Sequence, residues 1–232
     1  MTPAKLITEI ENSLYPLANQ DRARAMSAYL LNQFEFLGLP APIRRTVVKD
    51  LIKSRFEHVN DLLVVAATLW SKKEREFRYT AIDLLKQHSS MLNSENLPDL
   101  CDLLLRDSWW ETVDGLSSVI SSVMLAEHKR QVQVSCVMDE WLTHKDKWVR
   151  RAAMLHQLGW RMETNSIRLT QYALTLADEK EFFIRKAIGW ALRDYARWNP
   201  GFVRQFVNEN KYFLSPLTMR EASKHLRNLS QG

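Results

Sequence analysis

The segment 108–114, Ser-Trp-Trp-Glu-Thr-Val-Asp, combines two adjacent tryptophans with a carboxylate. Its pattern predicts the first turns of a helix, with Ser108 as the N-cap and Glu111 completing a capping box. Trp110 and Asp114 are four residues apart, so their side chains share one face of that helix. An indole beside an anion suits a cationic, planar or sugar-like ligand. Taken alone, a structural role is the more frequent one, because tryptophans usually pack in cores and helix carboxylates usually face water.

The composition indicates a helical protein of mildly basic charge. The 232 residues include only 6 glycines and 7 prolines, and Leu, Ala, Glu, Lys and Arg are abundant. The formal net charge of +5 follows from 32 lysines and arginines against 27 acidic residues. This charge is compatible with a nucleic-acid partner but is not specific for one.

Several classes of protein are not expected. Cys101, Cys136 and the six histidines show no metal-ligand spacing, so neither a metal site nor a cofactor is predicted. No apolar run reaches membrane-spanning length, and the first residues, Met-Thr-Pro-Ala-Lys, lack the apolar core of a signal peptide. A soluble, cytoplasmic protein with reduced cysteines is therefore expected.

One pattern recurs along the chain: an apolar or aromatic residue, often an arginine two places later, and a small apolar residue four places later. It begins at Ile43, Phe77, Trp109, Trp148, Phe183 and Thr218. These starts are separated by 34, 32, 39, 35 and 35 residues. A period near 35 residues with helical patterning inside each unit is typical of an α-solenoid in which each repeat holds two helices.

The predicted fold is therefore all-α, a curved α-solenoid of about six HEAT-like helical repeats. The residues before Gly38 are expected to form helices that cap the first repeat. Helix starts are predicted at Ser71-x-x-Glu74, Thr143-x-x-Asp146 and Asp178-x-x-Glu181. A single continuous domain over residues 1–232 is expected.

The repeat register predicts which side chains are buried. In five repeats the first residue and the residue four later are expected to form a core pair, as Trp109 and Val113 do in the third repeat, and the exception is Thr218 at the last start. Trp110 and Asp114 then lie about 100° around the helix, outside the core stripe. A register shifted by one would bury Asp114, and a buried carboxylate would need a partner.

Arginines recur at one position of the repeat. They stand two residues after the start, as Arg45, Arg150, Arg185 and Arg220. This recurrence favours hydrogen bonds between repeats for most of them. Arg151 departs from that position by one residue, which makes it a better candidate to face a ligand.

Five ordered segments resemble the DNA alkylation repair family of AlkD-like glycosylases, which are built from HEAT-like repeats. They are residues 32–38, 74–78, 108–114, 147–152 and 182–190. The likeness extends over nearly the whole chain. At Glu111 an aspartate is expected in much of the family, and this difference falls on a predicted capping position.

The resemblance implies roles for particular residues. Asp114 corresponds to the catalytic aspartate, and Trp110 and Trp190 correspond to the two tryptophans of the active site. Arg151 matches the arginine that grips the DNA backbone near the lesion, and Tyr29 matches a nearby aromatic residue. Further phosphate contacts are expected from the scattered arginines Arg45, Arg78, Arg150 and Arg185.

The implied activity is a DNA glycosylase of base excision repair, acting as a monomer on double-stranded DNA that contains alkylated purines. It would hydrolyse the N-glycosidic bond of N7-methylguanine and N3-methyladenine without enclosing the base in a pocket. Two alternatives stay open from the sequence. One is a non-catalytic HEAT-repeat protein that binds DNA by shape, and the other is a protein-binding scaffold.

Overall fold

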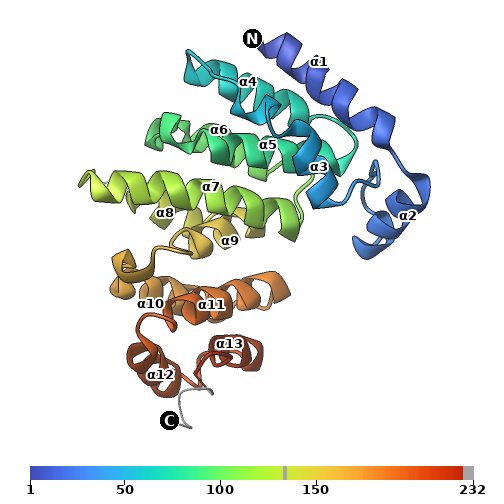
Figure 1. Ribbon diagram of the computed structural model, residues 1–232. Helices are drawn as coiled ribbons and strands as arrows, with labels where there is room; N and C mark the ends of the chain where they lie inside the picture. The colour runs from blue at the N-terminus through green and yellow to red at the C-terminus, as the bar shows by residue number, and fades with distance from the viewer. Residues whose placement is uncertain (133–134, 227–232) are drawn as a thin grey trace. The chain divides into compact units, whose positions relative to one another are not determined.

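The computed structural model describes residues 1–132 and 135–226 (Figure 1). These residues form thirteen α-helices and five short 3-10 helices, with no β-strand among them. The predicted all-α fold is confirmed. The chain contains two compact units, Met1–Leu92 and Asn93–Gly232, and the expectation of one continuous domain stays a prediction. Among the described helices, none is both long and apolar enough to cross a membrane.

The first unit, Met1–Leu92, contains five α-helices. They are α1 (Pro3–Leu14), α2 (Gln20–Tyr29), α3 (Ala41–Val48), α4 (Val59–Trp70) and α5 (Arg75–Gln87), with 3-10 helices at Tyr15–Leu17, Leu51–Lys53 and Ser89–Met91. The α1 helix packs against α3 and α4, and α4 packs against α5. Of the helices that precede the first predicted repeat, α1 covers α3 and α4, as expected of a terminal cap.

Two segments of the first unit that carry the family resemblance meet in space. The carboxylate of Glu76, which is fully buried, accepts hydrogen bonds from the backbone N–H groups of Leu37 (3.0 Å), Gly38 (2.8 Å) and Leu39 (3.0 Å). Gly38 has a φ of +84°, and a Cβ there would lie 2.2 Å from the carbonyl oxygen of Asn19. Only glycine fits such a position. The connection from α2 to α3 is thus fixed to the first turn of α5.

The second unit, Asn93–Gly232, is built from pairs of helices. They are α6 (Leu97–Leu104), α7 (Trp110–Lys129), α8 (Ser135–Leu142), α9 (Lys147–Leu155), α10 (Ser166–Thr175), α11 (Phe182–Tyr195), α12 (Pro200–Glu209) and α13 (Pro216–Ala222), with 3-10 helices at Ser94–Asn96 and Arg161–Glu163. The α7, α9, α11 and α13 helices pack side by side in that order (Figure 1). The α6, α8, α10 and α12 helices each pack against the helix that follows them. This arrangement confirms the predicted helical repeat.

The small residues of the predicted core pairs are buried in the second unit, whereas the starting residues Trp109 and Phe183 are half-buried. The residues four after each repeat start, Val113, Ala152, Ala187 and Ala222, are at most 1% exposed. The aromatic residues that start three consecutive repeats meet in one cluster, in which the ring centroids of Trp109, Trp148 and Phe183 are 5.0 to 5.9 Å apart. The small residue at one position and the ring at the other allow neighbouring helices to interlock.

The close approach of α11 and α13 depends on a glycine. A Cβ at Gly189 would lie 2.5 Å from the Cβ of Glu221 and 2.8 Å from the carbonyl oxygen of Thr218. The hydroxyl of Thr218 also donates a 3.0 Å hydrogen bond to the carbonyl of Arg185 in α11. Any larger residue at position 189 would push the two helices apart.

The register of the first repeat was predicted wrongly by one residue. Ile43 is 39% exposed, whereas the buried positions of α3 are Arg44, at 2%, and Val48, at 0%. An arginine takes an apolar position in this core because its two terminal nitrogens are bonded, Nη1 to Thr80 Oγ1 (3.1 Å) and Nη2 to Asp83 Oδ2 (2.7 Å) of α5. A polarity pattern cannot reveal a buried cation whose partners lie one repeat away.

The predicted capping residues also need correction. The α5 and α11 helices begin directly after Glu74 and Glu181, and neither N-cap makes a side-chain hydrogen bond. The α9 helix begins after Asp146, whose carboxylate accepts from the N–H of Trp148 at 2.7 Å. Each helix therefore starts at the acidic residue and not three residues earlier. Ser71, one of the predicted caps, instead ends α4.

Candidate active site

The α7 helix begins one residue later than the sequence pattern predicts. Its N-cap is Trp109, in extended conformation and without a side-chain cap. The predicted capping box is wrong, because the hydroxyl of Ser108 donates to the carbonyl of Leu104 at the end of α6. Trp110 is consequently the first residue of α7, and Asp114 follows one turn later. The shared face predicted for these two residues is retained.

Asp114 forms a two-pronged ion pair with Arg151 of α9. The Nε of Arg151 donates to Asp114 Oδ1 at 2.8 Å, and Nη2 donates to Oδ2 at 2.9 Å. Paired parallel hydrogen bonds of this kind fix the carboxylate orientation as well as adding attraction. The Nη1 of Arg151 donates to the carbonyl of Phe183 in α11. One guanidinium thus joins α7, α9 and α11.

The two partners differ in exposure. The Arg151 side chain is 4% exposed, and the Asp114 side chain is 16% exposed. Solvent therefore reaches the carboxylate more than the guanidinium. Arg151 was expected to face DNA, but in the structure its guanidinium is buried behind Asp114. A DNA contact by Arg151 stays a prediction.

The surroundings of Asp114 raise the pKa of its carboxyl group above the ordinary value of 3.8. Burial is the largest cause, because it penalises the charged form. The hydrogen bonds and charge of Arg151 act in the opposite direction, Glu111 raises the pKa further, and Lys186 lowers it. An ion pair to arginine ordinarily lowers the pKa of a carboxyl group. Here desolvation outweighs it, so the anion is held in a dry environment.

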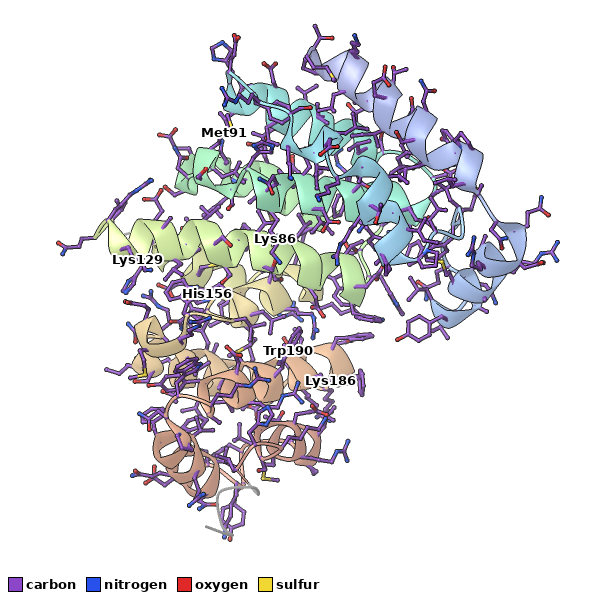
Figure 2. The ribbon with its side chains drawn as sticks, in the orientation of Figure 1. Lys86, Met91, Lys129, His156, Lys186 and Trp190 are labelled. Carbon is purple, nitrogen blue, oxygen red and sulfur yellow. The ribbon has the colours of Figure 1, made fainter. Side chains whose placement is uncertain are left out.

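Trp190 and Lys186 belong to α11, the helix that Arg151 also contacts (Figure 2). They are four residues apart, the same spacing that separates Trp110 from Asp114. Both tryptophans are half-buried. The candidate active site is therefore defined by Trp110 and Asp114 on α7, Arg151 on α9, and Lys186 and Trp190 on α11.

Lys186 is the member of this site that sequence reasoning missed. It is exposed, and its charge lies close enough to Asp114 to influence its ionisation. A signal was available, because Lys186 follows Arg151 by 35 residues, which is one repeat. Residues at equivalent repeat positions on adjacent helices face the same side. The predicted active site therefore contained the anion but lacked one of the two cations beside it.

Arg150 is engaged inside the second unit. Its Nη1 donates to the carbonyls of His144 (2.7 Å) and Lys145 (2.9 Å), and its Nε lies 2.6 Å from Glu179 Oε1. The ion pair with Glu179 connects α9 to the segment that precedes α11, in agreement with the expected role between repeats. A phosphate contact by Arg150 stays a prediction. In the same unit, the Nε of Arg185 donates to the carbonyl of Glu179 at 2.6 Å, and a phosphate contact by Arg185 stays a prediction.

Three further predicted DNA-binding residues belong to the first unit and differ in accessibility. Tyr29 is the last residue of α2 and is 73% exposed. The Arg45 side chain is 63% exposed and pairs with Asp83 of α5. Arg78 is only 5% exposed, and its Nε donates to the carbonyl of Trp70 at 3.0 Å. Tyr29 and Arg45 can therefore reach a ligand as they stand, whereas Arg78 holds α4 to α5.

No group of three or more His, Cys, Asp or Glu residues within the described part of the chain is placed to hold a metal ion. The chemistry available at the candidate active site is that of a partly desolvated carboxylate, paired with a guanidinium and influenced by an ammonium group. A place for the indoles of Trp110 and Trp190 beside this carboxylate stays a prediction.

Comparisons with known proteins identify relatives of the chain. The family model of the DNA alkylation repair enzyme matches residues 10–226. A predicted DNA alkylation repair enzyme from Enterococcus faecalis is similar over 90% of this chain and 96% of its own, with 33% identity and a TM-score of 0.82. Among curated proteins, no sequence matches the chain significantly.

Two solved structures from Streptococcus mutans share the fold. AlkD2 is 18% identical over 96% of this chain and 98% of its own, with a TM-score of 0.63. The protein smu.31 of strain UA159 is 20% identical over 88% of this chain and 97% of its own, with a TM-score of 0.60. The helical arrangement described above is therefore shared at low sequence identity.

Proposed function

Because the chain belongs to the DNA alkylation repair enzyme family, we propose that it is a DNA glycosylase that removes cationic alkylated purines from duplex DNA. N7-methylguanine and N3-methyladenine are the proposed substrates, and the N-glycosidic bond is the one hydrolysed. The observation that carries this proposal is the Asp114 carboxylate. It is fixed by Arg151, partly desolvated and still accessible.

The proposed substrates explain why one carboxylate is enough. A purine alkylated at N7 or N3 carries a positive charge, so it leaves as a neutral base when it takes the electron pair of the glycosidic bond. Positive charge then develops on the deoxyribose, and water attacks C1′ and loses a proton. A preorganised anion beside the sugar stabilises this transition state more than the ground state. No general acid is needed, since the departing base requires no proton.

Each residue of the candidate active site has a proposed role. Asp114 supplies the negative charge and orients the attacking water. Arg151 acts as a positioning residue, because it fixes both carboxylate oxygens. Trp110 and Trp190 offer indole faces to the developing cation, and such contacts contribute about 0.5–2 kcal/mol each.

One observation favours a second candidate function. Both oxygens of Asp114 already accept hydrogen bonds from Arg151, as they would in a purely structural ion pair. A duplex-binding protein without catalysis would have the same arrangement. The raised pKa of Asp114 supports the enzymatic role, because perturbed pKa values are concentrated at functional sites. An ion pair that served stability alone would gain if the attraction of Arg151 fully offset the cost of burying the carboxylate.

A panel of duplexes that each contain a single lesion tests the proposed function. Base release from N7-methylguanine and N3-methyladenine is expected, with little release of uracil, hypoxanthine or 8-oxoguanine. These neutral bases need protonation or strong hydrogen bonding in order to leave. Product analysis under single-turnover conditions measures the outcome. Release of uracil at a rate comparable to that of N7-methylguanine would overturn the mechanism, and binding without any release would favour the second candidate.

A further inference from the structure

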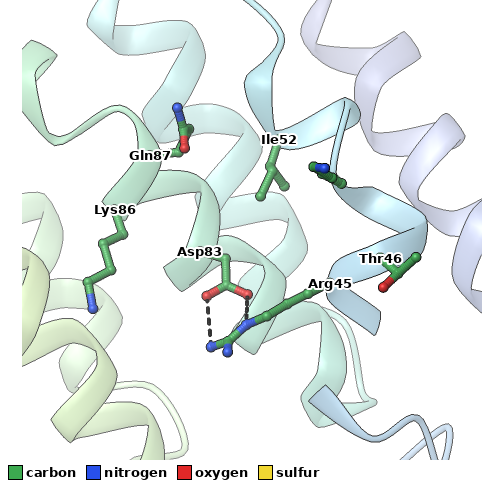
Figure 3. Close-up of a pocket in the computed structure, with 7 residues that line it drawn as sticks. Arg45, Thr46, Ile52, Asp83, Lys86 and Gln87 are labelled. Carbon is green, nitrogen blue, oxygen red and sulfur yellow. Dashed lines mark hydrogen bonds and ion pairs between the residues drawn. The ribbon is translucent and has the colours of Figure 1, made fainter. Parts of the chain in front are cut away.

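The first unit contains an open pocket of about 430 Å³ between α3 and α5. We name it the cationic pocket, because Arg45, Lys49 and Lys86 line it together with a single acid, Asp83. Figure 3 shows Arg45 and Lys86 on either side of Asp83. No residue of the proposed glycosylase chemistry belongs to this pocket.

The charges of the cationic pocket do not balance. Three cations face one carboxylate, which leaves an excess of two positive charges. The carboxylate is also shared with a fourth cation, since Arg44 Nη2 donates to Asp83 Oδ2 at 2.7 Å from inside the core. Burial lowers the pKa of the Arg44 guanidinium, Asp83 acts in the opposite direction, and the neighbouring charge of Arg45 lowers the pKa. An anion that entered the pocket would relieve this repulsion.

Arg45 can change partners at little cost. Its bonds to Asp83 are long, at 3.1 Å from Nε and 3.3 Å from Nη2, and its side chain is 63% exposed. Ion pairs between exposed groups contribute about 1 kcal/mol or less. Asp83 would not be left unpaired, because the shorter bond from Arg44 remains. The guanidinium of Arg45 is therefore available to an incoming anion.

We propose that the cationic pocket binds a backbone phosphate of duplex DNA, with Arg45 exchanging Asp83 for the phosphate. A guanidinium fork matches two phosphate oxygens, and the ammonium groups of Lys49 and Lys86 add charge without demanding a fixed geometry. The open shape suits a group that belongs to a long polymer. This inference rests on the proposed function for its choice of partner, and it adds a phosphate site formed by the first unit.

The test measures how affinity for an undamaged duplex depends on salt. The double variant Lys49→Ala/Lys86→Ala is compared with Lys5→Ala/Lys180→Ala, which removes the same charge from exposed lysines elsewhere. Loss of one phosphate contact should lower the slope of log affinity against log salt by about 0.9. The control pair should leave the slope close to that of the unmodified protein. Because the duplex carries no lesion, the result does not depend on whether the protein excises bases.

A second measurement separates the backbone of DNA from free phosphate. Inorganic phosphate is titrated at constant ionic strength while the backbone amide signals of residues 45–49 and 83–87 are followed by NMR. A lower slope in the pocket variant alone supports the proposal. An unchanged salt slope in the pocket variant overturns the proposal. If phosphate then still shifts the amide signals, the pocket is a site for small anions. If it does not shift them, the cluster of charges is purely structural.

Discussion

The two units each contain an arginine–aspartate pair of nearly equal burial, Arg44–Asp83 in the first and Arg151–Asp114 in the second. The arginine side chains are 2% and 4% exposed, and the aspartate side chains are 15% and 16% exposed. Each pair joins neighbouring repeats, across 39 residues of sequence in the first case and 37 in the second. Contact geometry alone would assign both the same role.

The surroundings of the two pairs differ. Asp83 has a second arginine, Arg45, so its charge is more than matched. Asp114 has one arginine in contact, and the carboxylate of Glu111 raises its pKa. The surroundings of Arg44–Asp83 are therefore suited to bind an anion. Those of Arg151–Asp114 are suited to place the Asp114 carboxylate beside a cationic ligand. The same ion pair can serve opposite purposes according to the charges around it.

The largest expected effect is on catalysis at Asp114. Asp114→Asn should slow single-turnover release of N7-methylguanine by about 10²–10³-fold, because it removes charge stabilisation of the developing sugar cation. Asp139→Asn is the control for loss of a carboxylate charge in the second unit, where Asp139 lies near Arg168 and accepts a hydrogen bond from the Tyr172 hydroxyl.

The Asn variant leaves Arg151 as a buried charge without its anion, which can itself destabilise the fold. The double variant Asp114→Asn/Arg151→Met removes both charges and addresses this problem. It should fold and remain inactive. Excision near the unmodified rate in a folded Asp114→Asn protein would eliminate the proposed role of the carboxylate.

The second prediction contrasts the two arginines that share Asp83. Arg44→Ala should destabilise the protein by about 3–5 kcal/mol, because it leaves a largely buried carboxylate without its main partner. Arg45→Ala should cost about 1 kcal/mol or less, since that side chain is exposed. Urea denaturation monitored by circular dichroism measures both. Equal destabilisation would show that Arg45 is fixed in the structure and not free to exchange partners.

The sequence predicted more of the fold than of the active site, and the reason is the range of the interactions. Repeat starts at Trp109, Trp148 and Phe183 were found from period and polarity alone, because these properties are local to each helix. The pairing of Arg151 with Asp114 was not predicted, since it depends on how adjacent repeats are rotated. A cue existed in the separation of the two residues by 37 positions, close to one repeat.

The error at Arg44 has the same origin. Its burial depends on Thr80 and Asp83, which lie in the next repeat. Polarity patterns treat every arginine as a surface residue, and they fail where a charge is paired inside a core. Scanning for arginine–aspartate separations close to the repeat length would have suggested both pairs.

The third prediction separates two roles of Arg151. Arg151→Ala should slow excision by at least about 10-fold, because the carboxylate loses its fixed orientation. The salt slope on undamaged duplex should not change, since the guanidinium is buried. Arg151→Lys should recover only part of the rate, because an ammonium cannot donate to both oxygens in parallel. A slope lowered by about 0.9 would instead reveal the direct phosphate contact that the family resemblance implies.

The smallest expected effect is a shift in the pH dependence of excision. The reaction needs Asp114 ionised, so activity should fall as the pH decreases through the pKa of its carboxyl group. That pKa is raised above 3.8, so the acid limb of the profile should lie above the value of an ordinary aspartate. Excision rates are measured as a function of pH at enzyme concentrations below saturation, so that the profile reports ionisation in the free protein. The rate of spontaneous base loss in acid is subtracted at each pH.

Two charge-removing variants should move this acid limb in opposite directions. Lys186→Gln removes a cation that lowers the pKa of Asp114, so the limb should move to higher pH. Glu111→Gln removes an anion that raises it, so the limb should move to lower pH. Lys180→Gln and Glu140→Gln remove equal charges at exposed positions and should leave it in place. If both site variants shifted the limb in the same direction, its titration could not be that of Asp114, and the carboxylate that limits excision would lie elsewhere.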